Sequence, residues 1–180
     1  MTRLMGWAVT VVVAGLLAVG TLAADDKKDK PDTAKIPKAV MDALKAKFPK
    51  AEITKWTEET EEGKKVYDIE FTMGDVKHEA DLFEDGTLHN WEKEIAVKDL
   101  PDAVKKAADK KYPKATVKEA MQVTGVKDKK EALDGYEVLL VTADKKEVEL
   151  MIDPEGKILE DSTEKKEEKK PEEKKKEDKK

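Results

Sequence analysis

The chain contains two copies of one segment, and this duplication restricts the fold more than any other feature. Ile36–Trp56 aligns with Leu100–Ala120 at a shift of 64 residues, and eight of the 21 aligned positions are identical. The fold must therefore provide two similar units. The identical pairs are Pro37/Pro101, Ala39/Ala103, Val40/Val104, Ala43/Ala107, Lys47/Lys111, Pro49/Pro113, Lys50/Lys114 and Ala51/Ala115.

The similarity continues past this segment. Tyr67-x-Ile69-x-Phe71 aligns with Tyr136-x-Val138-x-Leu140, and the turn Asp85-Gly86 aligns with Glu155-Gly156. The shift grows to 69 and then 70 residues, so we expect the additional residues in a loop over Gln122–Asp134. A unit of about 60 residues buries little surface alone, so the two copies are expected to share a core or pack closely.

Each unit is expected to begin with a helix and continue with strands. Apolar residues recur at helical spacing after Pro37 and Pro101, which suit a first helical position because proline has no N–H. Pro49 and Pro113 disfavour helical geometry at the preceding residue and end each helix. Alternating polarity predicts four strands in each unit. Their expected ranges are 51–58, 66–73, 76–83 and 87–94, and then 115–123, 135–143, 146–153 and 157–160.

The two ends of the chain differ from its middle. Residues 1–23 are typical of an export signal, because Arg3 precedes a charge-free run that ends in small residues, with cleavage expected after Ala23. An uncleaved membrane anchor is the alternative interpretation. Residues 24–35 and 161–180 are charged and poor in apolar side chains, so we expect a disordered linker and a disordered Lys/Glu-rich tail.

Composition argues against most kinds of enzyme. The chain has no Cys, its only Ser is Ser162, and its only Arg is Arg3. Thiol chemistry, Ser–His–Asp catalysis and Cys-based metal sites are therefore excluded from the folded part. The lysines of the tail alternate with glutamates and lack aromatic neighbours, which argues against nucleic-acid binding. We expect no catalytic residues, no cofactor and, after signal cleavage, no membrane partner.

The repeated pattern resembles that of the PepSY-like domain family. The residues that carry the resemblance are the I/L-P-x-A-V…A…K-F/Y-P-K-A segment, the Y-x-I/V-x-F/L strand and the later D/E-G turn, over roughly 36–94 and 100–160. The resemblance implies an α+β fold of two tandem repeats, each one helix followed by an antiparallel sheet of about four strands, like the beta-lactamase inhibitory protein. It also implies a secreted or periplasmic protein, and it suggests peptidase binding or inhibition only by analogy of fold.

The two histidines and the acidic turn are candidate metal ligands by residue type. His78 and His89 lack the H-x-x-x-H and H-E-x-x-H spacings, and His78 points away from the neighbouring acids of its strand. The run Asp81–Gly86 does not supply oxygen ligands at the alternate positions of an EF-hand loop. The sequence therefore predicts no metal site, although diffuse cation binding by an acidic core stays open.

A partner-binding surface is expected on the sheet face away from the helices. Regular alternation from Ile53 and Leu88 places Trp56 and Trp91 on that face. The acidic residues Asp68, Glu70, Glu79 and Asp81 are expected on the same side. The alternative is that the apolar residues seal the junction between the repeats. The predicted partner-binding residues are Trp56, His89, Trp91, Leu139, Val141 and Met151.

These observations favour one functional hypothesis and one alternative. The hypothesis is an exported, non-catalytic module of the bacterial envelope that binds a protein or peptide. A narrower form of this hypothesis is that the bound protein is a peptidase, which the module inhibits. The alternative is a structural or cation-buffering envelope protein without a specific partner. The domain division expected with either is an export signal at 1–23, a linker at 24–35, repeats at 36–98 and 99–160, and a tail at 161–180.

Overall fold

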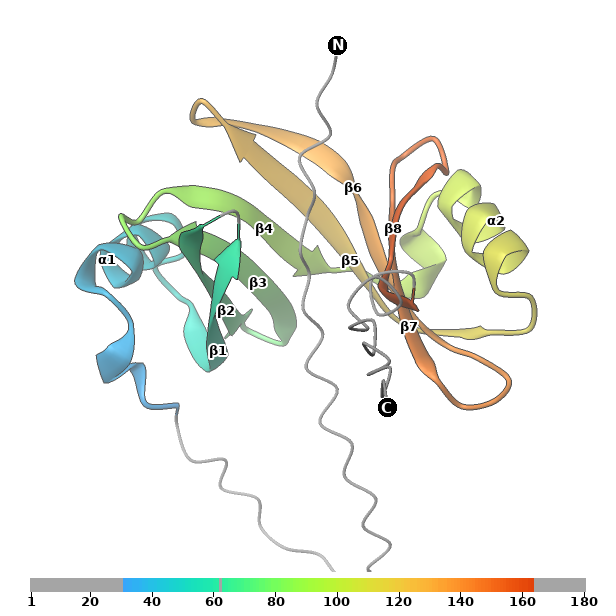
Figure 1. Ribbon diagram of the computed structural model, residues 1–180, viewed down its shortest axis with the longest axis horizontal. Coiled ribbons are helices and arrows are strands. Elements are labelled where there is room, and N and C mark those ends of the chain that lie inside the picture. The colour runs from blue at the N-terminus through green and yellow to red at the C-terminus, as the bar shows by residue number, and fades with distance from the viewer. Residues whose placement is uncertain (1–30, 62, 164–180) are drawn as a thin grey trace, which may run out of the picture.

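The computed structural model describes residues 31–61 and 63–163 (Figure 1). Two helices and eight strands follow one another in the order helix, four strands, helix, four strands. The helices are α1 (Lys38–Lys47) and α2 (Asp102–Lys111), each preceded by a short 3-10 helix, η1 (Thr33–Lys35) and η2 (Val97–Asp99). The strands are β1 (Glu52–Glu61), β2 (Lys64–Met73), β3 (Val76–Phe83), β4 (Leu88–Glu94), β5 (Thr116–Lys127), β6 (Lys130–Val141), β7 (Glu147–Ile152) and β8 (Ile158–Asp161).

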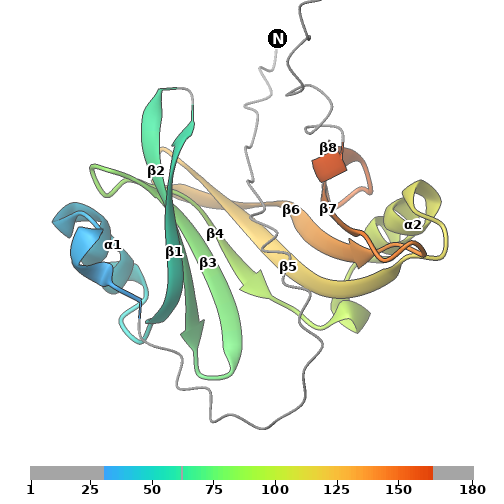
Figure 2. The same cartoon turned by 60° about the horizontal axis from the view of Figure 1, so that its bottom comes forward.

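All eight strands form one antiparallel sheet in chain order. The sheet is strongly curved, and both helices lie on its outer side, α1 beside the first four strands and α2 beside the last four (Figure 2). We call this outer side the helix face and the opposite side the open face. The α+β class and the antiparallel arrangement expected from the sequence are confirmed.

The repeats do not share a core but lie directly against each other, which is the second of the two expected arrangements. The helix face carries two separate hydrophobic clusters, one around Leu44 and Phe71 and the other around Val104 and Leu140. Each helix covers only its own repeat, because the curvature of the sheet turns the two helices away from each other (Figure 2). The repeats are joined instead by backbone pairing of β4 with β5, from Asn90 opposite Gly125 to Glu94 opposite Met121.

The helices begin one residue later than expected. Pro37 and Pro101 are the capping residues, and their carbonyl groups accept the first helical hydrogen bonds, from Met41 and Lys105. At the other end, the backbone N–H of Phe48 donates to the carbonyl of Leu44 at 2.7 Å, just before Pro49 stops the helix. The second helix ends in the same way at Tyr112.

One turn glycine in each repeat holds the sheet against its helix. Gly86 and Gly156 both have positive φ, 84° and 89°, a conformation that side chains other than glycine rarely adopt. A Cβ atom at these positions would lie only 2.6 Å and 2.7 Å from the carbonyl oxygens of Ala39 and Ala103. The D/E-G motif is therefore needed for the close approach of turn and helix, as well as for the turn itself.

β-Bulges recur at equivalent positions of the two repeats. Thr54 and Lys118 are the additional residues in β1 and β5, and the register of β4 and β8 shifts in the same way at His89 and Leu159. One additional residue moves every following side chain of a strand to the opposite face. The regular alternation assumed from the sequence is therefore wrong beyond these points.

The longest hairpin replaces an expected loop. Residues Gln122–Asp134 do not form a loop, because β5 and β6 stay paired up to Lys127 opposite Lys130. Asp128 and Lys129 make the turn with positive φ values of 52° and 62°. Neither residue is glycine, so the sequence lacks the usual signal for this kind of hairpin turn.

The expected terminal segments fall mostly outside the described residues. This is true of the export signal at 1–23 and of most of the linker and tail. Within the described part, Thr33–Lys35 forms η1, and Asp161 belongs to β8. No helix in the described part of the chain is long and apolar enough to cross a membrane.

Candidate binding surface

The two tryptophans lie on the helix face, so their predicted position is wrong. Trp56 lies opposite Ile69 and Trp91 opposite Ala80, and both partners belong to the first hydrophobic cluster. The bulges at Thr54 and His89 cause the change. Leu139, Val141 and Met151 lie on the open face as expected, opposite Glu149, Glu147 and Glu137.

Trp91 joins the first core to the second repeat. Its ring lies 5.8 Å from the Phe48 ring in an edge-on arrangement, and the ammonium of Lys47 lies 5.2 Å from its centroid. The indole N–H donates to Glu131 Oε2 at 3.1 Å, and Glu131 also forms an ion pair with Lys47. Because Glu131 belongs to β6, these contacts seal the junction between the repeats, as the alternative interpretation expected.

Trp56, His78 and His89 each lie against an aromatic residue of the sheet. Trp56 stacks on Tyr67 at 6.3 Å, and its indole N–H donates to the carbonyl of Asp32 at 3.0 Å. His78 is buried in the first core and stacks on Phe71 at 5.4 Å. His89 lies 5.3 Å from Phe83, beside the open face, and burial lowers its pKa despite the nearby carboxylate of Asp134.

The open face combines many carboxylates with an apolar region. In strand register, its carboxylates outnumber its lysines, which are Lys55, Lys64, Lys77, Lys127 and Lys130. The apolar side chains concentrate on β5, β6 and β7, as Met121, Val123, Leu139, Val141 and Met151, and the first repeat adds Val66 and Phe83. The carboxylates are Glu52, Glu59, Asp68, Glu70, Glu79, Asp81, Glu92, Glu94, Glu119, Glu137, Glu147, Glu149 and Glu160.

Transverse rows of residues show how closely the carboxylates follow one another. The first row runs across five strands through Lys55, Glu70, Glu79, Glu92 and Val123. Glu70 is therefore directly opposite Glu79, and Glu79 is directly opposite Glu92. Like charges at directly opposite positions destabilise an antiparallel pair.

A second row runs through Thr57, Asp68, Asp81 and Asn90, and again places two carboxylates opposite each other. The amide of Asn90 donates to Oδ2 of Asp81 at 2.7 Å, so Asp81 has a hydrogen-bond donor beside it in this row.

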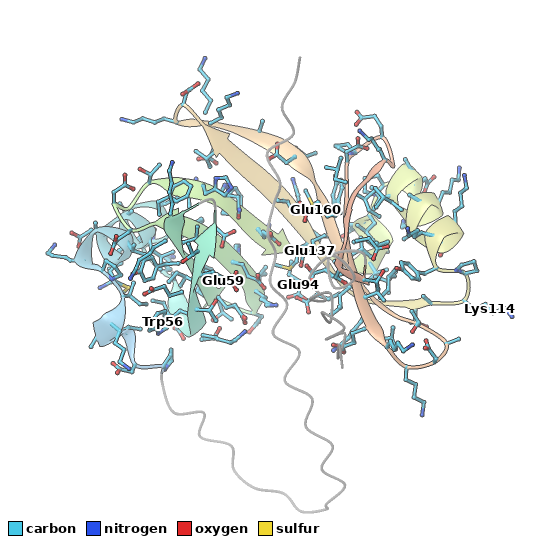
Figure 3. All side chains as sticks on the ribbon, viewed as in Figure 1. Trp56, Glu59, Glu94, Lys114, Glu137 and Glu160 are labelled. Atoms are coloured by element: carbon cyan, nitrogen blue, oxygen red, sulfur yellow. The ribbon has the colours of Figure 1, made fainter. Side chains whose placement is uncertain are left out.

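A third row alternates carboxylates and methionines through Glu94, Met121, Glu137, Met151 and Glu160. Figure 3 shows the labelled Glu94, Glu137 and Glu160 near the middle of the sheet, while Trp56 and Lys114 lie toward opposite ends of the molecule. The carboxylates thus continue from the first repeat across the junction into the second.

The electrostatics of this surface favour proton uptake. Burial raises the pKa of Asp68 to about 8, and the carboxylates of Asp81, Glu79 and Glu70 add to this effect. Burial also raises the pKa of Glu92, with further contributions from Glu79 and Asp81. The open face therefore holds several carboxyl groups that ionise less readily than free side chains.

The pKa of Glu137, near the junction between the repeats, is raised as well. Burial raises its pKa, and the nearby carboxylates of Glu92, Glu149 and Glu79 raise it further. A side-chain hydrogen bond joins Glu137 to Glu149, so one of the two carboxyl groups donates while the other accepts. Glu92 and Glu137 are not among the residues that the sequence predicts to bind a partner. Leu88 and Trp91 are apolar residues of one strand and lie three positions apart. This spacing indicates an additional residue in the strand. The additional residue moves Glu92 to the open face.

The comparisons with known proteins point to one family. The sequence profile of a family described as "Putative beta-lactamase-inhibitor-like, PepSY-like" matches this chain twice, over residues 23–88 and 65–160. A search of curated proteins found no match.

Solved structures of similar fold come from Bacteroides species. A DUF2874 family protein from Bacteroides uniformis is 18% identical, with a TM-score of 0.52, and the match covers 69% of this chain and 87% of that chain. A protein from Bacteroides eggerthii described as periplasmic is 16% identical, with a TM-score of 0.52, covering 69% and 86%. A DUF2874 family protein from Bacteroides ovatus is 16% identical, with a TM-score of 0.50, covering 69% and 85%. At these identities the similarity concerns the fold.

Proposed function

The chain belongs to the PepSY-like family of beta-lactamase-inhibitor-like proteins, and on that premise we propose that it is an exported, non-catalytic envelope protein that binds a protein partner. Binding takes place through the open face of the sheet. The inhibitor-like description of the family supports a non-catalytic role, and the periplasmic description of the Bacteroides eggerthii protein supports export.

One observation carries this proposal: apolar side chains are present on the sheet face that is turned away from both helices. An antiparallel sheet that packs on one side usually alternates apolar residues toward the core with polar residues toward water. Here Leu139 and Val141 are partly exposed on the open face, and Met151 continues the same apolar region. Apolar patches with polar surroundings are typical of protein-binding sites.

Photo-cross-linking in the native bacterial envelope tests the proposal. The photoreactive residue p-benzoylphenylalanine replaces Val141 on the open face in one variant and Lys106 on the exposed side of α2 in the control. We expect one saturable cross-linked partner from position 141 and none from position 106.

Two results would overturn the proposal. One is equal cross-linking from both positions. The other is diffuse cross-linking that disappears at high salt, which would favour the cation-buffering alternative, because exposed charges are screened over about 10 Å at 0.1 M salt. If a partner is captured and proves to be a peptidase, its activity with and without the purified chain decides whether binding also inhibits.

A further inference from the structure

Glu92 is a buried carboxylate without a complete set of hydrogen bonds. Its side chain lies on the open face, and only 6% of the residue is exposed. Its Oε2 atom finds no hydrogen-bond partner among the described residues, and the same is true of Oδ1 of Asp68 in β2. Burying an ionised carboxylate without a partner is strongly unfavourable, so folding alone gives no reason for this arrangement.

Two lysines of the open face, Lys55 and Lys77, are already engaged in ion pairs. Lys77 forms ion pairs with Glu79 at 2.8 Å and with Glu119 at 2.9 Å. Lys55 pairs with Glu70 at 2.6 Å. The two orphan oxygen atoms thus lie among further carboxylates and receive no ion pair from either lysine.

Apolar side chains flank Glu92 on the open face. Val123 lies directly opposite Glu92 in β5, and Met121 follows two residues away on the same face; both are buried. Lysine and arginine bury their methylene stems on apolar surface while the charged end reaches polar groups. A compact metal ion fits less well, because residues 31–61 and 63–163 contain no group of three or more His, Asp or Glu side chains that could hold one.

We propose that Glu92 and Asp68 receive a lysine or arginine side chain that a segment of the protein partner inserts into the open face. This inference rests on the proposed function and names the chemistry that the partner presents. A basic segment would supply the hydrogen-bond donors that the two carboxylates lack, and its charge would relieve the repulsion between the adjacent rows.

Binding of this kind is linked to proton release. The charged groups facing Glu92 and Asp68 are Lys55 from β1, Glu70 from β2, Lys77, Glu79 and Asp81 from β3, Glu137 from β6 and Glu149 from β7. Carboxylates dominate this set, so the two groups retain protons at a pH where free carboxyl groups are ionised. A bound cation lowers their pKa values and expels those protons, and affinity therefore rises from pH 6 to pH 8.5.

Calorimetric titration with a hexalysine peptide tests the inference. The probe is compared with hexa(acetyl-lysine), which has the same length without the charges. The variants are Glu92→Gln and Asp68→Asn, and the matched controls are Glu155→Gln in an exposed turn and Asp109→Asn on the exposed side of α2. Each substitution removes one carboxylate, so a diffuse effect of net charge is equal in variants and controls.

We expect saturable one-to-one binding of hexalysine that is at least tenfold weaker in Glu92→Gln and Asp68→Asn and changes less than twofold in the controls. We also expect proton release in buffers of different ionisation enthalpy, and no binding of hexa(acetyl-lysine). A thermal midpoint no lower than that of the wild type shows that each variant is folded.

Equal weakening in variants and controls, or no binding of hexalysine to the wild type, overturns the inference. A partner cross-linked from position 141 would then still support the proposed function, so the two failures are distinguishable.

Discussion

At equivalent positions of the sheet, Ile69 in β2 corresponds to Val138 in β6, and both are fully buried beneath a helix. The helix face keeps its character in the next pair as well, Phe71 and Leu140. On the open face the repeats differ. Glu70 corresponds to Leu139, and Asp81 corresponds to Met151, so each opposed pair of carboxylates in the first repeat becomes a carboxylate opposite an apolar side chain in the second.

This difference separates the requirements of folding from those of binding. Both copies need an apolar helix face, because each helix and its four strands must bury a core of their own. The open face lies outside both cores and has diverged between the copies. We infer that the residues specific to one copy, above all Glu70, Asp81 and Glu92, are those available for recognition.

One exception on the helix face has a topological cause. Trp91 in β4 corresponds to Asp161 in β8. β4 is an interior strand, and its tryptophan packs beneath Lys47 and on Phe48. β8 is an edge strand, and Asp161 instead accepts a hydrogen bond from Tyr112 at 2.7 Å and pairs with Lys111 at 3.3 Å.

The largest expected effect comes from truncation of matched core residues. Phe71→Ala should lower the free energy of unfolding by about 3–5 kcal/mol and Leu140→Ala by about 2–5 kcal/mol, since both leave a cavity beneath a helix. Urea denaturation followed by circular dichroism measures the change. A loss below about 1 kcal/mol at either position would show that the two helix faces are not equivalent.

The turn glycines should show the closest agreement between the repeats. Gly86→Ala and Gly156→Ala should each cost about 3 kcal/mol, because a side chain is strained at positive φ and also meets a helix carbonyl. Gly74→Ala is the matched control. It also has positive φ but nothing within 4 Å of the added atom, and should cost only about 1 kcal/mol. Tolerance of alanine at only one of the two positions would contradict their equivalence.

Replacement of Trp91 tests its placement on the helix face. Trp91→Ala should cost about 2 kcal/mol, because the half-buried ring leaves Phe48 and Lys47 without their contact. Cross-linking of the partner from position 141 should persist in this variant. An unchanged melting temperature together with loss of the cross-linked partner would show that Trp91 belongs to the binding surface.

The smallest effect is expected from the exposed ion pair that joins the repeats. Glu131→Gln should change the free energy of unfolding by less than about 1 kcal/mol, because Glu131 and Lys47 are both partly exposed to water. Thermal unfolding at low and high salt measures this change. A loss above about 2 kcal/mol would mean that the ion pair, rather than backbone pairing of β4 with β5, holds the repeats together.

The sequence was sufficient for the features that depend on local spacing. The apolar stripe and the flanking prolines predicted both helices to within a few residues, and the D/E-G motif predicted both turns. The expected face of Leu139, Val141 and Met151 is correct, because no bulge lies between these residues and Tyr136, Val138, Leu150 and Ile152, from which the alternation was counted.

The features that depend on strand register could not be obtained in this way. Counting alternate residues assumes a regular strand, and the single additional residues at Thr54 and His89 reversed the faces of Trp56 and Trp91. The carboxylate rows arise only when three neighbouring strands are aligned, so the sequence did not single out Glu92. The β5–β6 hairpin was missed because Asp128 and Lys129 adopt positive φ without a glycine.

The most direct test of this division between folding and binding is the stability of Glu92→Gln as a function of pH. Burial and the carboxylates of Glu79 and Asp81 raise the pKa of Glu92 in the folded state, whereas the unfolded value is about 4.3. The folded wild type therefore binds more protons than the unfolded chain above this pH, and its stability falls as the pH rises. The glutamine variant lacks this loss.

Urea denaturation of both proteins at pH 4 and pH 8 decides the question. We expect nearly equal stability at pH 4 and a variant more stable than the wild type at pH 8, because only the wild type loses stability as Glu92 ionises. A Glu92→Gln variant that is less stable than the wild type at pH 8 would show that the ionised carboxylate supports folding, and would contradict the assignment of the open face to binding.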